Sequence, residues 1–366
     1  MKRIVVKVGT AVISRAEGGL NTPRLRQLAE ELAGLQKKGF APLLVTSGAI
    51  GAGMDAFGWK TRPTVLRDKQ AAAAVGQVAL MEAYKAAFAA QGVTVAQVLL
   101  TRTDMEERDR YLNIRNTLHA LLERGVLPVI NENDTVSTDE IKFGDNDTLS
   151  ALVATKMEST HLFLLTDVEG LLTGTGADGR LLPEVFQITP DIEALVQAGA
   201  GSAKSAGGMA SKLSAARLAM ASGVEVWIAS GRRPGVVRDI LEGKGRGTRF
   251  VPTEETLSAR KRWIAFGRRT KGALHLDDGA VRAITEGKKS LLPSGLAKVD
   301  GLFHAGDTVK VLDARGREIA RGLTAHGSLD LQKIKGRRSS EVEALLGHPA
   351  PAEVIHRDNL VVLSNL

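Results

Sequence analysis

The sequence predicts an α/β protein with a three-layer αβα sandwich around a mainly parallel open sheet, followed by a small, mainly β, barrel-like domain. At 366 residues the chain is longer than one typical domain, which suggests two. Hydrophobic residues make up 43% of it and charged residues 25%, a balance typical of folded globular proteins. Short apolar runs alternate with longer helical stretches up to about Phe250, after which the pattern changes.

The alternation predicts a series of strand–helix units. The apolar runs carry Val, Ile and Leu at successive positions, as expected of parallel strands covered by helices on both faces. In chain order the predicted strands are IVVKVG, APLLVTSG, VTVAQVLL, VLPVIN, HLFLLTD and VEVWIAS. The helices predicted between them span residues 23–38, 69–90, 113–124, 147–157 and 209–222.

A stretch with a proline, polar residues and a charge run, VPTEETLSARKRW, predicts a linker between the domains. We therefore expect a first domain at residues 1–252, a linker at 253–263 and a second domain at 264–366. Short segments bounded by Gly and Asp predict the strands of the second domain. These segments are ALHLDDGAVRAI, AGDTVKVLD, REIARGLT and NLVVLSN.

The composition excludes several classes of function. The absence of cysteine excludes disulfides, thiolate zinc sites, iron–sulfur clusters and cysteine nucleophiles, and it favours a cytoplasmic location. The first residues lack the pattern of a signal peptide, and no stretch of 18 residues is free of charge, so we expect neither secretion nor a membrane span.

The net charge of +8 is concentrated at one end of the chain. Residues 258–366 contain 19 Lys and Arg against 12 Asp and Glu, a difference of +7. An excess of this kind suits an anionic partner such as nucleic acid, but a solvated surface would look the same, and both interpretations stay open here.

Three glycine-containing segments follow predicted strands, where ligands bind in open α/β sheets. Lys7, in KVGT, could reach a phosphate beside the flexible Gly9, although a surface lysine at a turn is the alternative. The second segment, TSGAIGAG, lacks the spacing of a dinucleotide fingerprint and fits tight strand–helix packing as well as ligand binding.

The third segment, SAGGMASK at residues 205–212, is predicted to be a loop that opens the helix at 209–222. Free N–H groups at a helix N-terminus, together with Lys212, would form an anion site. A Walker A loop would require Gly-Lys-Ser or Gly-Lys-Thr, which this segment does not contain.

Carboxylates and amides are densest at residues 131–134 (NEND) and 144–147 (GDND). Such groups can bind an ammonium group, orient lysines or hold Mg²⁺. Capping of the following helix by Asp145 or Asp147 is the alternative. His119 and His161 are interpreted as structural residues, and the motifs suggest neither a hydrolase nor a zinc enzyme.

Taken together and in this order, KVGT, VTSGAIGAG, TRTDMEER, INENDTV, GDNDTLSAL, LLTD, GGMASKL and IHRDN resemble the glutamate 5-kinases of the amino acid kinase family. SLLPSG, AGD and IHRDNLV resemble the PUA domain, which also occurs in RNA-modifying enzymes. The resemblance implies ATP-dependent phosphorylation of the γ-carboxylate of L-glutamate, with Mg²⁺ as a cofactor. The product would be γ-glutamyl phosphate, in the first step of proline biosynthesis.

The resemblance also implies partners. It suggests a homo-oligomer, feedback inhibition by proline and transfer of the product to γ-glutamyl phosphate reductase. RNA binding by the PUA-like domain is a further expectation, left open.

The resemblance implies roles residue by residue. Lys7 and Lys212 match the phosphate-binding lysines, and Asp147 matches the acidic residue that holds them. The glutamate-contacting positions are Ser47, Asp134 and Asn146. The ATP-contacting positions are Lys7, Thr166, Asp167, Ala206, Gly207, Gly208, Met209, Ala210, Ser211 and Lys212, and no metal-ligating residue is predicted. Ala206 stands where the family usually has Thr, so that position has no hydroxyl group with which to contact ATP.

Two other classes remain as alternatives. A kinase of the same fold that acts on aspartate, carbamate or a nucleoside monophosphate would keep Lys7, Lys212 and Asp147 and change the acceptor pocket. An RNA-binding or RNA-modifying protein would explain the basic C-terminal domain. A dehydrogenase is disfavoured because Gly-x-Gly-x-x-Gly does not follow the first strand.

Overall fold

The computed structural model describes residues 1–15, 18–137, 145–173, 179–198, 203–252, 261, 264–265 and 270–363. The chain divides into two compact units, Met1–Thr256 and Leu257–Leu366. Most of the expected linker, residues 253–263, falls outside the described residues, so its limits stay a prediction. None of the described helices is long and apolar enough to cross a membrane.

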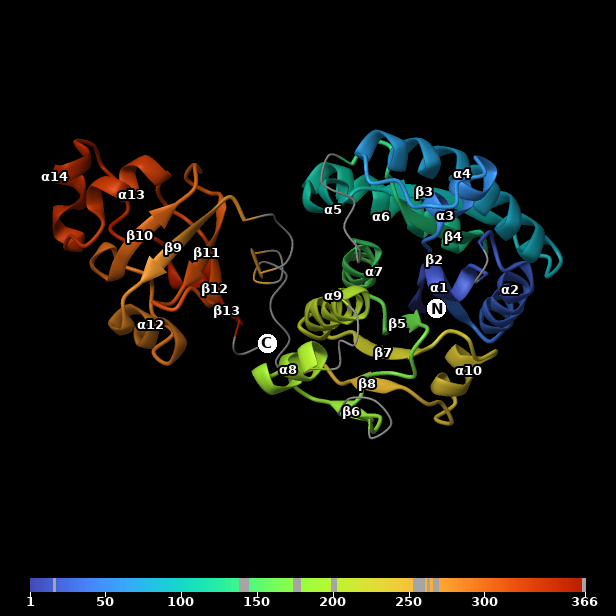
Figure 1. Ribbon diagram of the computed structural model, residues 1–366. Coiled ribbons are helices and arrows are strands. Elements are labelled where there is room, and N and C mark those ends of the chain that lie inside the picture. The colour runs from blue at the N-terminus through green and yellow to red at the C-terminus, as the bar shows by residue number, and fades with distance from the viewer. Residues whose placement is uncertain are drawn as a thin grey trace. The chain divides into compact units, whose positions relative to one another are not determined.

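The first unit is built on an eight-stranded sheet with the strand order β3-β4-β2-β1-β5-β7-β8-β6 (Figure 1). The strands are β1 (Lys2–Val8), β2 (Phe40–Val45), β3 (Val95–Leu100), β4 (Leu127–Glu132), β5 (His161–Thr166), β6 (Glu184–Val185), β7 (Glu225–Ser230) and β8 (Thr248–Phe250). From β3 across to β7 all neighbours are parallel, whereas β8 runs antiparallel to β7. The mainly parallel sheet of the sequence prediction is confirmed.

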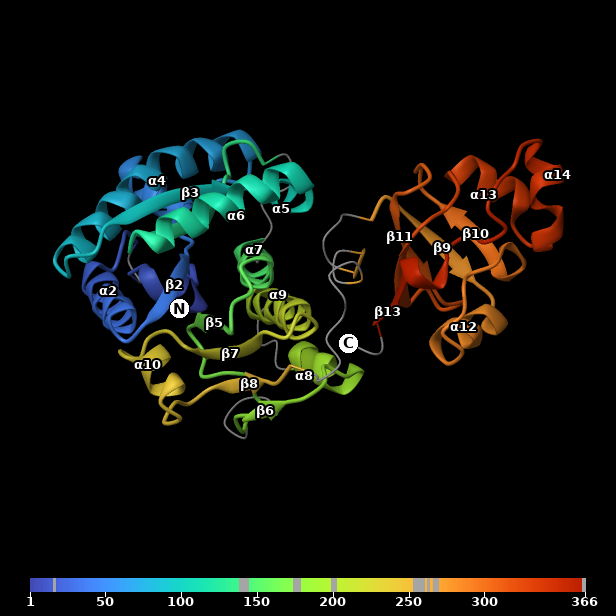
Figure 2. The same ribbon diagram turned by 180° about the vertical axis from the view of Figure 1, so that it is seen from behind.

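Helices cover both faces of this sheet. They are α1 (Thr10–Ile13), α2 (Thr22–Lys37), α3 (Ala49–Ala56), α4 (Leu66–Ala89), α5 (Arg102–Glu106), α6 (Arg108–Glu123), α7 (Asp145–Lys156), α8 (Pro190–Ala198), α9 (Ala203–Met220) and α10 (Val236–Leu241). Figures 1 and 2 show α2 and α10 on one side of the sheet and α7 and α9 on the other. The three-layer arrangement follows from this.

Strand β1 shows how the sheet sorts its side chains. Ile4, Val6 and Val8 are fully buried in a core cluster with residues of α2, α4 and α10. Because side chains alternate along a strand, Lys7 points to the opposite face, where α7 packs against β1. The strand therefore ends with a lysine directed at the α7–α9 layer.

The glycine-containing segment after β2 forms a turn and a helix. Gly48 has φ +95°, a left-handed conformation that glycine adopts readily, and α3 begins at the next residue. A Cβ atom on Gly53 would lie 1.8 Å from the carbonyl oxygen of Ala72, and one on Gly76 would lie 1.8 Å from that of Ala49. Helices α3 and α4 are thus in backbone contact, and tight packing accounts for Gly53 of this segment.

The second unit contains a separate five-stranded sheet in the order β10-β9-β11-β12-β13. Its strands are β9 (Gly272–Leu276), β10 (Leu296–Asp300), β11 (Thr308–Leu312), β12 (Glu318–Leu323) and β13 (Leu360–Val362), and its α-helices include α12 (Asp278–Thr285), α13 (Ser328–Ile334) and α14 (Val342–Leu346). Neighbouring strands are antiparallel except β9 and β11. The unit has its own apolar core.

One predicted β segment of this unit is partly helical. ALHLDDGAVRAI contains most of β9 and most of α12. The strand gives way to a helix because the Asp277 side chain caps α12 by accepting a hydrogen bond from the N–H of Ala280 at 2.7 Å. The helix that follows has a strongly apolar inner side, with Ile284 buried in the core.

Candidate active site

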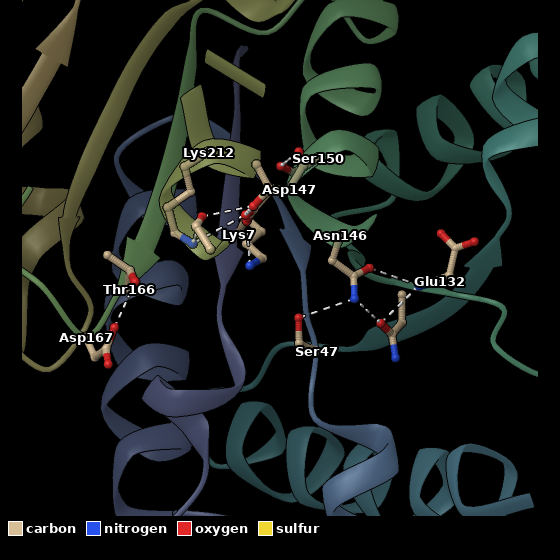
Figure 3. Close-up of polar contacts among 12 residues, drawn as sticks. Lys7, Ser47, Glu132, Asn146, Asp147, Ser150, Thr166, Asp167 and Lys212 are labelled. Atoms are coloured by element: carbon tan, nitrogen blue, oxygen red, sulfur yellow. Dashed lines mark hydrogen bonds and ion pairs between the residues drawn. The ribbon is translucent and has the colours of Figure 1, made fainter. Parts of the chain in front are cut away.

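Two lysines and an aspartate from three elements meet on the α7–α9 side of the sheet (Figure 3). Lys7 Nζ of β1 lies 2.6 Å from Oδ1 of Asp147, and Lys212 Nζ of α9 lies 3.3 Å from Oδ2 of the same carboxylate. All three side chains are buried, and Asp147 is only 1% exposed. The carboxylate therefore separates two cations that would otherwise repel each other.

Burial and charge act in opposite directions on these groups. Burial alone would raise the pKa of Asp147, but the charges of Lys7 and Lys212 lower it below its usual value, so the carboxylate stays ionised at neutral pH. For Lys212, burial lowers the pKa, and the charge of Asp147 works against that effect. Removing Asp147 would thus make Lys212 easier to deprotonate.

Two serine hydroxyl groups also form hydrogen bonds with Asp147. Ser211 Oγ donates to Oδ2 of Asp147 at 2.6 Å and is also 2.9 Å from the carbonyl oxygen of Gly208. Lys212 Nζ donates to the same carbonyl at 3.1 Å. Ser150 Oγ donates to the backbone oxygen of Asp147 at 2.6 Å. These bonds restrict the position of both Asp147 and Lys212.

A second group, made of amides, lies beside the first. Asn146 Nδ2 is 3.3 Å from Ser47 Oγ and 3.1 Å from Oδ1 of Asn131, and Asn146 Oδ1 accepts from the N–H of Glu132 at 3.1 Å. Asn146 and Asp147 are consecutive residues in the first turn of α7. We call Lys7, Asp147 and Lys212 the lysine group, and the hydrogen-bonded residues Asn146, Asn131 and Gln77 the amide group. One helical turn therefore connects the two groups.

Two further site residues predicted from the sequence lie at the end of β5. Thr166 Oγ1 donates to Oδ1 of Asp167 at 3.1 Å. The negative charge of Asp167 acts on Lys212, so this strand end is electrostatically part of the lysine group. Thr166 is paired with Ser230 in the neighbouring strand, and both side chains are buried.

The segment predicted to be a loop at residues 205–212 is helical in the structure. Because α9 already begins at Ala203, the N–H groups of Gly207 and Gly208 lie beyond the first four of the helix and are not free in the way that the predicted anion site requires. The side chains of residues 203–207, Ala206 included, are outside the described ones. Met209 is half-buried and Ala210 is exposed.

For the remaining predicted residue, Asp134, the structure shows an interaction with a residue outside the lysine and amide groups. Asp134 lies in the turn after β4, and its charge acts on Arg62 of the α3–α4 connection. The side chain of Asp145 is outside the described ones, whereas Asp147 is directed at the lysines, which argues against the helix-cap interpretation for Asp147.

Two buried members of the amide group, Asn131 and Gln77, were not among the site residues predicted from the sequence. Asn131 is 1% exposed, and Gln77 of α4 is 9% exposed. Asn131 lies in the NEND motif, which was predicted to bind an ammonium group, orient lysines or hold Mg²⁺, without a separate role for Asn131. The signal for Gln77 is a polar residue on the apolar side of a helix, three residues before the fully buried Leu80.

Known proteins resemble this chain over nearly its whole length. The model of the amino acid kinase family matches residues 2–230, and that of the PUA domain matches residues 272–346. A protein named glutamate 5-kinase from Moorella thermoacetica is 50% identical over 365 residues, which cover 99% of this chain and 96% of the relative. Its namesake from Gloeobacter violaceus is 50% identical over 372 residues, the full length of both chains. One from Myxococcus xanthus is 48% identical over 99% of this chain and 96% of its own.

The family match covers the eight-stranded sheet up to the end of β7, including all the residues of the lysine and amide groups. The PUA match lies within the second unit. The chain therefore belongs to the amino acid kinase family, and it carries a C-terminal PUA domain.

Proposed function

We propose that this chain is a glutamate 5-kinase, which transfers the γ-phosphoryl group of ATP to the γ-carboxylate of L-glutamate and forms γ-glutamyl phosphate. This is the first step of proline biosynthesis. The observation that carries the proposal is the buried Lys7–Asp147–Lys212 cluster, next to an amide group that suits a polar acceptor. The relatives' shared name supports glutamate as that acceptor.

The lysine group provides the electrostatics that this transfer requires. The reaction brings two anions together, a phosphate chain and a carboxylate, and their repulsion is the main barrier to close approach. Phosphoryl transfer depends mostly on positioning and charge stabilisation. We assign Lys7 and Lys212 to the oxygens of the transferring group and Asp147 to holding both ammonium groups in place.

The acceptor needs no general base. A glutamate side chain has a pKa of about 4.3 and is already ionised at neutral pH, so its oxygen can attack phosphorus without losing a proton. This agrees with a site in which the described polar groups are lysines, amides, hydroxyls and carboxylates. We assign Ser47, Asn146 and Asp134 to glutamate. We assign Thr166, Asp167 and residues 206–212 to ATP, and because the N–H groups of Gly207 and Gly208 lie inside α9, the charge of Lys212 carries the contact from that segment.

The site also suits a Mg²⁺ ion carried by the nucleotide. Both oxygens of Asp147 are taken up by lysines and Ser211, and the described residues hold no group of three or more His, Asp or Glu side chains that could enclose a metal. Phosphate oxygens and water would then hold the ion, as is common for Mg²⁺. When bound, it supplies further positive charge against the phosphates.

One assay tests the proposed function. The protein is incubated with Mg-ATP and a panel of acceptors that includes L-glutamate, L-aspartate, carbamate and nucleoside monophosphates, and acyl phosphate is trapped with hydroxylamine. We expect hydroxamate formation and ATP consumption with glutamate. Consumption only with another acceptor would contradict the proposal and favour a different kinase of the same fold.

Substitution of Asn146 tests whether the glutamate-binding and ATP-binding parts of the site are separate. We expect Asn146→Ala to raise the KM for glutamate at least about tenfold, because groups that contact the amino acid are lost, with the KM for ATP within about twofold of its original value. Initial-rate kinetics with each substrate varied in turn measure both constants. If the two KM values rose together, the acceptor and nucleotide half-sites would not be separate.

We further propose that the PUA domain binds RNA, on the strength of the +7 charge of residues 258–366 and the domain's family match. Phosphate contacts predict an affinity for RNA that falls linearly with salt on a log–log plot. Replacing Lys333, Lys335, Arg337 and Arg338 with Gln should weaken binding and reduce the slope, as fluorescence anisotropy with the full chain and a short RNA would show.

The matched control replaces Lys37, Lys38, Lys244 and Arg246 of the first unit, which are likewise exposed, with Gln. This change should leave both affinity and slope nearly as they were. Equal losses from the two sets, or no measurable binding at low salt, would rule out a specific RNA surface on the PUA domain. Proline inhibition, a homo-oligomeric state, transfer to a reductase and a cytoplasmic location stay predictions.

A further inference from the structure

Four amide side chains form a series of hydrogen bonds from the edge strand β3 to Asn146, the residue that we assign to glutamate. Gln77 Nε2 of α4 donates to Oε1 of Gln97 on β3 at 3.0 Å. Asn131 Nδ2 of β4 donates to Oε1 of Gln77 at 2.9 Å. Asn146 Nδ2 then donates to Oδ1 of Asn131 at 3.1 Å. Each amide thus donates to the next one outward from the site.

This direction determines how the amide of Asn131 is turned. Asn131 Oδ1 accepts from Asn146 and also from the N–H of Glu132 at 3.0 Å. A flipped Asn131 would direct its NH₂ group at two other donors, and its oxygen would face Gln77. As long as Gln77 Oε1 accepts from Nδ2, the oxygen of Asn131 stays available to Asn146.

The same argument extends to Asn146. One of its N–H groups is occupied by Asn131, so the other is directed at Ser47 Oγ, 3.3 Å away. Its Oδ1 is held by the N–H of Glu132 at 3.1 Å. The amide that we assign to the acceptor is therefore oriented by Asn131, and Asn131 is oriented by Gln77.

Burial makes this arrangement sensitive to loss. Asn131 is 1% exposed and Gln77 9%, so water does not readily replace a missing partner. A buried donor without an acceptor is costly, and networks of buried amides gain from having every member satisfied. Without Oε1 of Gln77, the side chain of Asn131 would rotate to find another acceptor for its NH₂ group. That rotation would also move the oxygen to which Asn146 donates, so the Asn146 side chain would lose its orientation.

We infer that Gln77 is a positioning residue for the acceptor substrate, acting through Asn131 on Asn146. It lies on α4, it is separated from Asn146 by one intervening side chain, and the sequence assigns it no function. The inference rests on the proposed function, because it assumes that Asn146 contacts glutamate. Its effect should therefore appear in glutamate binding and leave ATP binding unchanged.

The test is Gln77→Met, which keeps an unbranched side chain of similar length and removes both hydrogen-bonding groups. We expect the KM for glutamate to rise about tenfold, the KM for ATP to stay within about twofold and kcat to change by less than about threefold. Isothermal titration with glutamate should show the same loss of affinity. Circular dichroism checks that the variant is folded.

Two further variants separate positioning from a general loss of stability. Gln36→Met removes one hydrogen bond from an α2 glutamine to the carbonyl oxygen of Gly125 and should leave the KM for glutamate unchanged. Gln97→Met removes only the hydrogen bond from Gln77 to Gln97, the one farthest from Asn146, and should raise the KM for glutamate less than about twofold. Equal KM values for Gln77→Met and the unmodified enzyme, or parallel rises for glutamate and ATP, would overturn the inference. If instead the unmodified enzyme does not phosphorylate glutamate at all, the proposed function fails first.

Discussion

Lys212→Met and Lys7→Met are each expected to lower kcat at least about a hundredfold. Each change removes one positive charge that we assign to the transferring phosphoryl group, in a buried site where charge is weakly screened. A loss of this size corresponds to about 2.7 kcal/mol of transition-state stabilisation, within the range found when one preorganised donor is removed. Steady-state rates with saturating glutamate and Mg-ATP measure it.

The fold should survive either change. Methionine retains the unbranched apolar part of the lysine, and the other lysine still faces Asp147. Lys38→Met is the control, because Lys38 forms a surface ion pair with Glu242 at 2.8 Å, and such pairs contribute little. Near-normal turnover in a folded Lys7 or Lys212 variant would remove that lysine from the transfer step.

Asp147→Asn is expected to lower kcat by a similar factor and, in addition, to change the pH profile. The charge of Asp147 supports the protonated form of Lys212 against burial and against Lys7, which both lower its pKa. Without that charge the pKa of Lys212 falls further, so the lysine loses its proton at lower pH. Activity of the variant should then decline with rising pH in a range where that of the unmodified enzyme is constant.

A buried aspartate in the other unit provides the matched control. Asp313 is 6% exposed and accepts a hydrogen bond from Arg317 Nε at 2.7 Å. Asp313→Asn should lower the melting temperature and leave the pH profile of kcat as it was. If Asp147→Asn behaved in the same way, with reduced stability and an unshifted profile, its role would be structural.

Much of the arrangement of the lysine and amide groups was predictable because several of their residues lie at strand ends. Lys7, Thr166 and the Asn131–Glu132 pair each lie at or next to the end of an apolar run, and parallel strands bring such ends to one edge of the sheet. That Lys7 faces the α7–α9 layer also follows from alternation along β1. A local pattern had marked Lys212 as part of an anion site, but only the family resemblance supplied its pairing with Lys7, 205 positions away.

Other features depend on tertiary contacts that no local pattern encodes. The start of α9 at Ala203 was missed because two successive glycines, Gly207 and Gly208, predict a loop, whereas packing of the helix against α7 overrides that preference. The antiparallel β8 is three residues long, too short for a periodic signal. Gln77 lies in an alanine-rich helix, and its partners come from β3 and β4.

The crossing of α3 and α4 limits how the substrate range of this enzyme can be changed. With hydrogen atoms as the only side chains of Gly53 and Gly76 at the contact, the two helices are already as close as backbones allow. Helix α3 begins two residues after Ser47, so any side chain that pushed it outward to admit a longer acceptor would also displace the Ser47 hydroxyl. On the proposed assignment of Asp134 to the acceptor, room for larger amino acids is therefore more accessible through changes near Asp134, in the turn after β4, than through movement of the helices, and redesign should begin there.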